Sequence, residues 1–375
     1  MSDTEIGVRV DQALLDLRRE LGVSEIGEFF RDAVCLSASF AEGVGHTEAY
    51  TTNIEWRESR GASLKRYNTV IRLDLHATTH AELPWAVLPK WWERAIKSEL
   101  VTASPPHPRS DAGRELMRSM VEPKVMEAIV IDLTFMRQWL LDALVAAGKY
   151  GTPEDTEEDE IKWEPTLLGE DLSGCEPEVI RKLLKNLRIS VADLKAAFAL
   201  IHDPASCIVV FRTGWEVFLP SARYELQVPW HPYYFHPFLD LDCLDLIAEL
   251  GIAGVAADSS GLSCPMHDMG RQSAPPAMKT VRTEILGAKS SGDISPSLIL
   301  RPVRLRLLAS GSYYITGIHF PLEFDQVGEL EAGLSFKNDE TVARVESGQL
   351  LMVPVPIGGP AIDALPLMLF WRSER

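Results

Sequence analysis

The order of apolar and polar positions predicts both helices and strands in this chain. Between residues 8 and 33, apolar side chains recur with a period near 3.6 residues, which predicts an amphipathic helix. Residues 69–76 alternate between apolar and polar side chains, as expected for a strand with one buried face. Two short apolar runs, at residues 126–133 and 207–212, predict strands that are buried on both faces.

The middle of the chain alternates between predicted helices and strands. Helices are expected at residues 134–148, 191–201 and 239–251, with Ser190 as the N-cap of the second. The apolar run at residues 252–258 predicts a further buried strand. Because strands that alternate with helices usually form a sheet covered by helices, this order predicts an α/β fold.

Three segments lack such a period and are predicted to be loops. They are the Pro- and Ser-rich residues 102–111, the acidic residues 151–164 and a long insertion at residues 264–302. Loops as long as the insertion are usually functional lids or disordered segments. Strand-like patterning returns at residues 304–318 and 349–357.

Composition and charge narrow the classes of partner. Of the 375 residues, 46% are hydrophobic and 24% are charged, which is typical of a globular chain with a full core. A net charge of −17 without a basic stripe argues against a nucleic-acid partner. No apolar run is long enough to span a membrane, and the charged N-terminus does not resemble a secretory signal. Five cysteines without C-x-x-C spacing argue against a zinc ribbon and favour the reducing cytoplasm.

The sequence HATTHAELP at residues 76–84 holds the most informative candidates for chemistry. His76 and His80 are four residues apart, so they share one face of a strand or a helix, and Glu82 joins them if the chain is extended. Two imidazoles and a carboxylate can bind a divalent metal that acidifies water and polarises a carbonyl. The spacing also arises by chance, so surface or core histidines remain the alternative.

The same segment resembles the signature of the cyclase family, which includes bacterial kynurenine formamidases, isatin hydrolases and some polyketide cyclases. The family signature reads H-x-G-T-H-x-D-x-P-x-H, and this chain has HATTHAELPWA at residues 76–86. Further blocks resemble the family in order and spacing, at residues 35–45, 127–133, 189–215, 236–262 and 302–318. The resemblance covers most of residues 35–320.

The resemblance implies a fold and an assembly. We expect one compact α/β domain with a twisted, β-barrel-like central sheet and outer helices. Residues 1–34 would form an N-terminal helical segment, and residues 35–375 would form the cyclase-like domain with the acidic loop and the insertion. Family members commonly form dimers or tetramers, so a homodimer or homotetramer is expected.

Some residues of this chain differ from the family pattern at positions that would affect metal binding. Family motifs identify His76, His80 and Glu82 as the metal ligands, and they place Arg304 and Thr316 where family members have a further metal-binding His and Glu. The proton-transfer histidine that ends the signature is replaced by Ala86. The resemblance therefore allows one Zn or Mn ion, with a metal-free site to which Arg304 adds a fixed positive charge as the alternative.

Other side chains are candidates for the same site. His267 in the insertion, or His319 beyond the last block, can replace a lost ligand or base; both can also be structural. Arg212 can bind a carboxylate as a two-pronged donor, or form a structural ion pair. Aromatic side chains can form an apolar wall for a flat substrate or simply pack in the core. The aromatic candidates are Trp85, Tyr233 and Tyr234.

Three functions remain open from the sequence. The first is metal-assisted hydrolysis or cyclisation of a small aromatic or polyketide-like amide, lactone or carbonyl compound. The second is a metal-free cyclase, lyase or isomerase with a histidine base and an arginine that stabilises an oxyanion. The third is a non-catalytic binding protein on the same fold. The catalytic candidates are His76, His80, Arg304 and His267.

Overall fold

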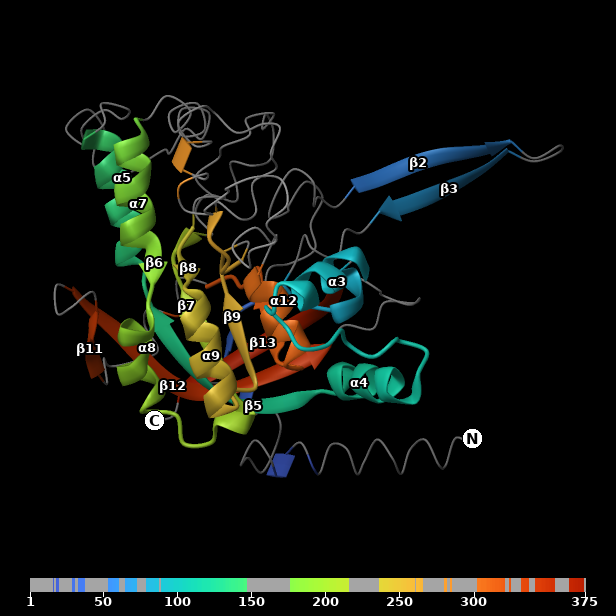
Figure 1. Cartoon of the computed structure of the whole chain (residues 1–375). Coiled ribbons are helices and arrows are strands. Elements are labelled where there is room, and N and C mark those ends of the chain that lie inside the picture. Colours follow the sequence, from blue (N-terminus) through green and yellow to red (C-terminus); the bar gives the residue numbers. More distant parts are fainter. Residues whose placement is uncertain are drawn as a thin grey trace.

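The protein is described from a computed structural model (Figure 1). The residues described are 16, 18–19, 29–30, 33–37, 53–60, 65–72, 79–87, 89–146, 176–215, 236–259, 261–265, 280–281, 284, 302–320, 324, 332–336, 341–354 and 364–373. Within these ranges, every helix is too short or too polar to cross a lipid bilayer.

One mixed sheet of nine strands organises the described part of the chain. Its parallel centre consists of β5 (Lys124–Asp132), β7 (Cys207–Arg212), β9 (Gly254–Ala257) and β10 (Tyr313–Thr316). Antiparallel strands flank this centre: β1 (Val34–Cys35), β4 (His80–Glu82), β11 (Ala332–Phe336), β12 (Thr341–Pro354) and β13 (Ala364–Ser373). The strand order is β1-β13-β4-β10-β9-β7-β5-β12-β11.

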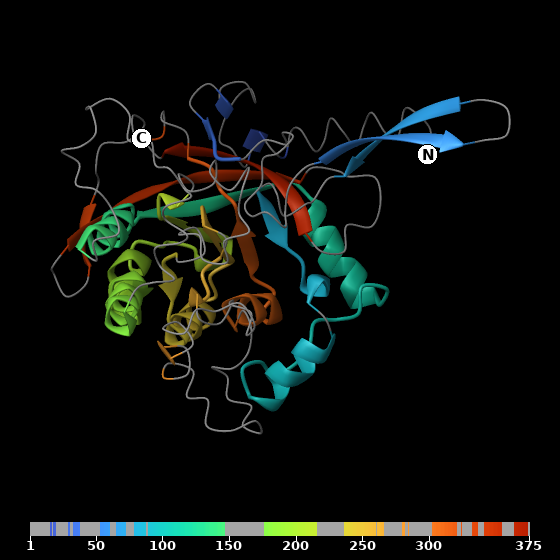
Figure 2. The same ribbon diagram turned by 90° about the horizontal axis from the view of Figure 1, so that it is seen from above.

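The sheet curls back on itself. In addition to its neighbours in that order, β13 pairs with β12 from Leu367 to Ser373. This pairing joins the two ends of the run from β13 to β12, so the strands form a barrel-like ring. Figure 2 shows β12 and β13 arching over the shorter parallel strands.

Two cores lie on the two faces of this curled sheet because side chains alternate along each strand. The inner face contributes Ala128, Val130, Ile208, Val210, Ala256 and Ile315 to a core enclosed by the curl. The outer face contributes Ile129, Ile131, Val209, Phe211, Val255 and Ala257 to a core covered by helices. The apolar runs at residues 128–131 of β5 and 207–211 of β7 follow from burial on both faces.

Helices cover the outer face. They are α3 (Pro89–Lys97), α5 (Phe135–Ala146), α7 (Pro177–Leu187), α8 (Val191–Phe198), α9 (Leu241–Leu250) and α12 (Pro302–Ala309), while α4 (Asp111–Val121) packs Met120 against the inner core. Capping residues determine where two of these helices begin or end. Ser190 and Asp193 form a capping box at the start of α8, and Gly251 ends α9 with a φ of 69°.

Two small sheets complete the described strands. The hairpin of β2 (Asn53–Arg60) and β3 (Lys65–Arg72) projects from the rest of the molecule in Figure 1. A parallel pair joins β6 (Arg188–Ile189) to β8 (Phe238–Leu239) beside α9. Pairing of Phe238 and Leu239 in β8 explains why α9 begins at Leu241 and not at residue 239 as predicted.

The predicted fold class is confirmed: the chain has a barrel-like α/β sheet with outer helices. One predicted element is wrong, because residues 302–309 form α12 and only Tyr313–Thr316 form a strand. The alternation of Arg and Leu in this segment resembles a strand, but six residues of α12 are buried, so no polar face reveals the helical period.

Several predicted segments lie mainly outside the described residues. Within residues 8–33, positions 16, 18–19 and 29–30 are helical, whereas residue 33 is not. The acidic residues 151–164 lie wholly outside the described ranges, as do most of residues 264–302. The loop predicted at residues 102–111 is confirmed up to Ser110, which accepts a hydrogen bond from the Gly113 N–H at the start of α4.

Candidate functional site

A buried polar cluster forms where β4, β10 and α12 meet. His80 and Glu82 stand two residues apart on β4, and His80 lies opposite Thr316 of β10 in the antiparallel register. Because Ala81 between them faces the inner core, His80 and Glu82 point to the outer face of the sheet. Arg304 reaches the same place from the first turn of α12.

Short distances join the four side chains. Nη2 of Arg304 lies 2.5 Å from Oε2 of Glu82. Nε2 of His80 lies 3.2 Å from Oγ1 of Thr316 and 3.8 Å from Oε1 of Glu82. The exposed fractions are 2% for His80, 5% for Glu82, 6% for Arg304 and 3% for Thr316, so the ion pair is shielded from bulk water.

This arrangement combines three chemical properties. Arg304 carries a charge that it cannot lose, and its guanidinium has five N–H donors. Glu82 offers one oxygen to Arg304 and turns the other toward the imidazole. The imidazole of His80 has two ring nitrogens, of which one can accept and the other can donate a hydrogen bond. The cluster can therefore hold negative charge and transfer a proton.

The side chains of the cluster do not fit a divalent metal. A metal bound by His80 and Glu82 would have to approach the carboxylate that Arg304 already contacts at 2.5 Å, and the fixed positive charge would repel it. Across the described ranges, no three His, Cys, Asp or Glu residues are grouped so that they could hold a metal ion. His76, the third predicted ligand, lies outside those ranges.

Arg212 lies on the opposite face of the sheet from this cluster. Its Nη1 donates to Oδ2 of Asp132 on the neighbouring strand at 3.1 Å. Its guanidinium carbon lies 5.3 Å and 5.1 Å from the ring centres of Phe320 and Phe324, both part of the inner core. The ion pair weighed as an alternative for Arg212 is therefore present.

Sequence reasoning missed the charged neighbours of Arg212. Asp132 lies between Arg212 of β7 and Arg344 of β12 in the register, so three charged residues stand side by side across the sheet. Arg344 pairs in turn with the buried Glu346. The signal was available, because Arg344 and Glu346 alternate with the buried Ala343 and Val345 of the same strand.

Asp258 has an architectural role. Its buried carboxylate accepts hydrogen bonds from the N–H groups of Thr213 and Gly214 and from Oγ1 of Thr213. These bonds fix the turn after β7, where Gly214 has a φ of 73°. Asp258 therefore links the ends of two parallel strands.

The remaining candidates are not gathered around His80 in the described structure. Nε1 of Trp85 donates to the carbonyl oxygen of Pro106 at 2.9 Å, and the half-buried ring packs against the inner core. The side chain of His319 is exposed, and its backbone N–H donates to the carbonyl oxygen of Leu36. The other candidates lie outside the described residues: His267, Tyr233 and Tyr234.

Three titratable groups outside the cluster have pKa values that burial shifts. Burial lowers the pKa of His236 to about 4, against a smaller opposing effect of its hydrogen bond to the carbonyl oxygen of Pro237. It raises the pKa of Cys207 and of Cys243 to about 12. These two thiols therefore stay protonated near neutral pH and are poor nucleophiles.

Comparison with known proteins gives one family match. Residues 176–262 match the model of a family described as putative cyclase. No curated protein sequence matches the chain.

Several solved structures match most of the chain, at low identity and with TM-scores below 0.5. Isatin hydrolase A from Ralstonia solanacearum is 15% identical, with 91% of this chain and 92% of that chain covered and a TM-score of 0.44. A protein described as a novel cyclase is 14% identical, with 93% and 92% covered and a TM-score of 0.46. A potential metal-dependent hydrolase with cyclase activity is 12% identical, with 92% and 98% covered and a TM-score of 0.40. At these scores the likeness carries no information on activity.

The predicted resemblance to the cyclase family is confirmed by the family match over residues 176–262, the segment that includes α7, α8, β7, α9 and β9.

Proposed function

We propose that the chain is an enzyme of the hydrolase or cyclase type, with its reaction centre at His80, Glu82, Arg304 and Thr316. Its substrate would be a small aromatic or polyketide-like amide, lactone or carbonyl compound. The observation that supports this best is the buried contact of 2.5 Å between Arg304 and Glu82, with the imidazole of His80 3.8 Å from the other carboxylate oxygen. Such a group of charges is costly to bury, which favours a chemical role.

Each side chain has a role in this proposal. His80 acts as the general base or acid that moves a proton at the substrate. Glu82 holds Arg304 in place through one oxygen and orients His80 through the other. Arg304 uses N–H groups not directed at Glu82 to stabilise negative charge on a substrate oxygen. Low exposure of all four strengthens these interactions because the local dielectric is low.

The charge of Arg304 favours chemistry without a metal. The competing proposal, a Zn or Mn ion on His76, His80 and Glu82, requires the ion to share a carboxylate with a permanent cation. In the metal-free proposal the guanidinium supplies the positive charge, and no activated metal-bound water takes part. Ring formation, isomerisation or elimination then suits the site better than hydrolysis.

Activity measurements on matched variants test this proposal. Wild type, His80→Gln and the control variant His319→Gln are assayed on a panel of aromatic amides, lactones and polyketide-like carbonyl compounds, with and without a chelator. We expect His80→Gln to lose about 10²- to 10⁴-fold in turnover, as for the loss of a general acid or base. We expect His319→Gln to keep its activity, because the side chain of His319 is exposed.

Two outcomes would contradict the proposal. Equal turnover by His80→Gln and wild type would exclude His80 as the proton-transfer residue. Activity that a chelator abolishes and Zn or Mn restores would support the metal-dependent alternative. Elemental analysis of wild type and of the His76→Ala/His80→Ala double variant measures bound Zn or Mn and needs no substrate.

Two coarser proposals concern the whole protein. The family resemblance supports a homodimer or homotetramer, which size-exclusion chromatography with light scattering would test. The cysteine pattern supports a cytoplasmic location, which fractionation of the source cells would test.

A further inference from the structure

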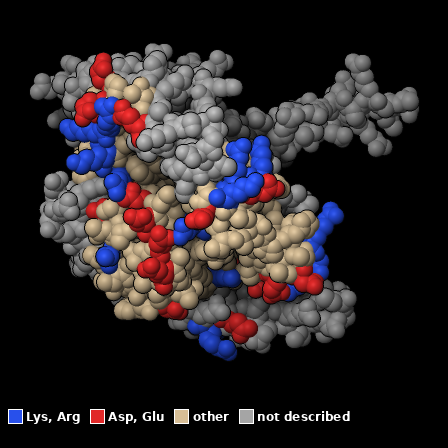
Figure 3. All heavy atoms as spheres, in the orientation of Figure 1, with Lys and Arg blue, Asp and Glu red and all other residues tan. Residues whose placement is uncertain are grey.

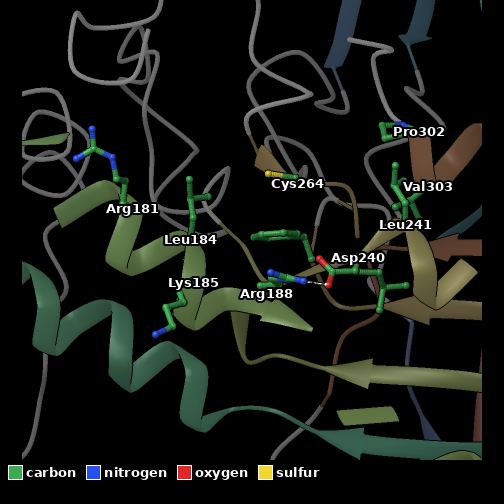
Figure 4. A pocket seen from close by; sticks show the side chains of 11 residues that line it. Arg181, Leu184, Lys185, Arg188, Asp240, Leu241, Cys264, Pro302 and Val303 are labelled. Atoms are coloured by element: carbon green, nitrogen blue, oxygen red, sulfur yellow. Dashed lines mark hydrogen bonds and ion pairs between the residues drawn. The ribbon is translucent and has the colours of Figure 1, made fainter. Parts of the chain in front are cut away.

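A pocket lies on the helical side of the molecule, between α7, β8, the start of α9 and the first residues of α12 (Figure 4). Its volume is about 370 Å³, which falls within the range of small-molecule sites. None of the four residues of the candidate site lines it. Val303 of its wall immediately precedes Arg304, so the pocket and the cluster share the first turn of α12.

The floor of the pocket is apolar. Leu184 of α7, Phe238 and Leu239 of β8 and Val303 of α12 are each buried and belong to the outer core. Figure 4 shows the side chains from α7, β8 and α12 arranged around one cavity. A floor of this kind takes an apolar body the size of one ring or a short hydrocarbon chain.

The rim on the α7 side is basic. Arg181, Lys185 and Arg188 follow one another at spacings of four and three residues, so they lie along one side of α7 and its continuation. In Figure 3, blue atoms gather where α7 lies, with red atoms beside them. Asp240 is the single carboxylate of the described lining.

The pairing of these charges shows where an anion would bind. Arg181 contacts Glu284 and Glu178 at 2.8–2.9 Å. Arg188 pairs with Asp240, with Nη2 2.5 Å from Oδ2. Lys185 is exposed, and within the described residues it takes part in no ion pair. The rim therefore offers one cation to a ligand, and a second at Arg188 that Asp240 partly neutralises.

We propose that this pocket binds a small apolar carboxylate, with its hydrocarbon body on the floor and its carboxylate at Lys185 and Arg188. A neutral apolar ligand would leave the basic rim unused, and a polyanion would exceed the charge available there. The proposal is independent of the proposed function, since it concerns binding at residues that the reaction centre does not use. A ligand in this pocket contacts the turn that carries Arg304.

Calorimetric titration of the full chain with phenylacetate tests the proposal. We expect wild type to bind one equivalent of phenylacetate, and to bind both phenylacetamide and acetate more weakly, since each lacks one half of the ligand. We expect Lys185→Glu to weaken binding about five- to tenfold, which corresponds to about 1 kcal/mol. The matched control is Lys182→Glu, on an exposed position of α7 that does not line the pocket, and its affinity should equal that of wild type.

A variant that should gain affinity for phenylacetate provides a second test. Asp240→Asn removes the carboxylate that competes for Arg188, and we expect it to tighten phenylacetate binding several-fold. Asp240 makes no side-chain capping bond to α9, and Arg188 is more than half exposed, so the variant should fold. Circular dichroism and thermal unfolding check the fold of each variant.

Three results would overturn the proposal. They are no phenylacetate binding by folded wild type at millimolar concentration, equal weakening by Lys185→Glu and Lys182→Glu, and Asp240→Asn that binds no more tightly than wild type. Alkylation of Cys264 locates the ligand, because this thiol lines the pocket. Phenylacetate should slow the alkylation of Cys264 but not that of the exposed Cys35, and equal rates at Cys264 with and without the ligand would place it elsewhere.

Discussion

At the scale of single residues, Arg304 decides the character of the polar cluster. Its guanidinium neutralises a carboxylate that is 5% exposed, so the two charges remain in the core only as a pair. Removing one partner of a buried pair leaves the other charge without compensation, whereas replacing both by apolar side chains is often tolerated. The pair can therefore be examined by stability, separately from any activity.

Arg304→Leu should reduce the free energy of unfolding by about 3–5 kcal/mol, because Glu82 then keeps a buried charge without its cation. Urea unfolding followed by circular dichroism measures this. The double variant Arg304→Leu/Glu82→Leu should recover most of the loss. The matched control is Arg114→Leu, which breaks an exposed pair with Asp111 and should cost less than about 1 kcal/mol. A loss in Arg304→Leu no larger than in this control would mean that the buried pair contributes nothing.

His236 should make stability depend on pH. Burial lowers its pKa to about 4 in the folded protein, whereas an unfolded chain has a histidine pKa near 6.5. Between these values the unfolded state binds more protons, so stability falls as the pH drops from about 7 to about 4, by on the order of 3 kcal/mol.

Urea midpoints of wild type and His236→Gln between pH 7 and pH 4.5 measure this contribution. The variant should show a shallower fall in stability with decreasing pH. The exposed His202 provides the control, and His202→Gln should keep the wild-type slope. The same slope in wild type and His236→Gln would contradict a buried neutral imidazole at position 236.

At the scale of elements, the close contact of β9 with β10 determines where Thr316 of the candidate site lies. Thr316 sits at the end of β10, so its distance from His80 depends on how β10 lies between β9 and β4. Gly254 allows this approach, since a Cβ at this position would lie 2.5 Å from Cβ and 2.7 Å from the backbone oxygen of Tyr313. The glycine is required by packing.

Gly254→Ala should therefore destabilise the protein by about 1–3 kcal/mol, the usual cost of overpacking, since β10 must move to admit the methyl group. Gly251→Ala is the comparison. Gly251 has a φ of 69° but nothing within 4 Å of an added Cβ, so only backbone strain of about 1 kcal/mol is expected. Thermal unfolding of both variants measures the difference, and a larger loss at Gly251 would contradict the packing argument.

At the scale of the whole molecule, the curled sheet separates two groups of buried or partly buried charges. His80, Glu82 and Arg304 lie on the outer face near α12, whereas Arg212 and Asp132 lie on the inner face. Closure of the ring through β12 and β13 produces this separation, because each strand then has an inside and an outside. Candidate site residues from distant motifs can thus lie on the same sheet and still point to opposite faces of it.

Local patterns in the sequence were sufficient for most central elements. The apolar runs predicted β5, β7 and β9 because burial on both faces favours apolar side chains at successive positions of a strand. Ser190 and Gly251 predicted helix ends, since capping and left-handed backbone depend on neighbouring residues alone. The sequence also identified His80, Glu82 and Arg304 as candidates, through the resemblance to the cyclase family.

Tertiary structure alone decided the rest. The helical state of residues 302–309 follows from their burial on several sides, which removes the polar face that would reveal the period. Which charged residues meet depends on strand register and on ring closure, and both join residues far apart in the chain. For this reason the sequence by itself determined the chemistry available at His80 and Glu82, while packing decided that Arg304 contacts Glu82 and that Arg212 does not lie with them.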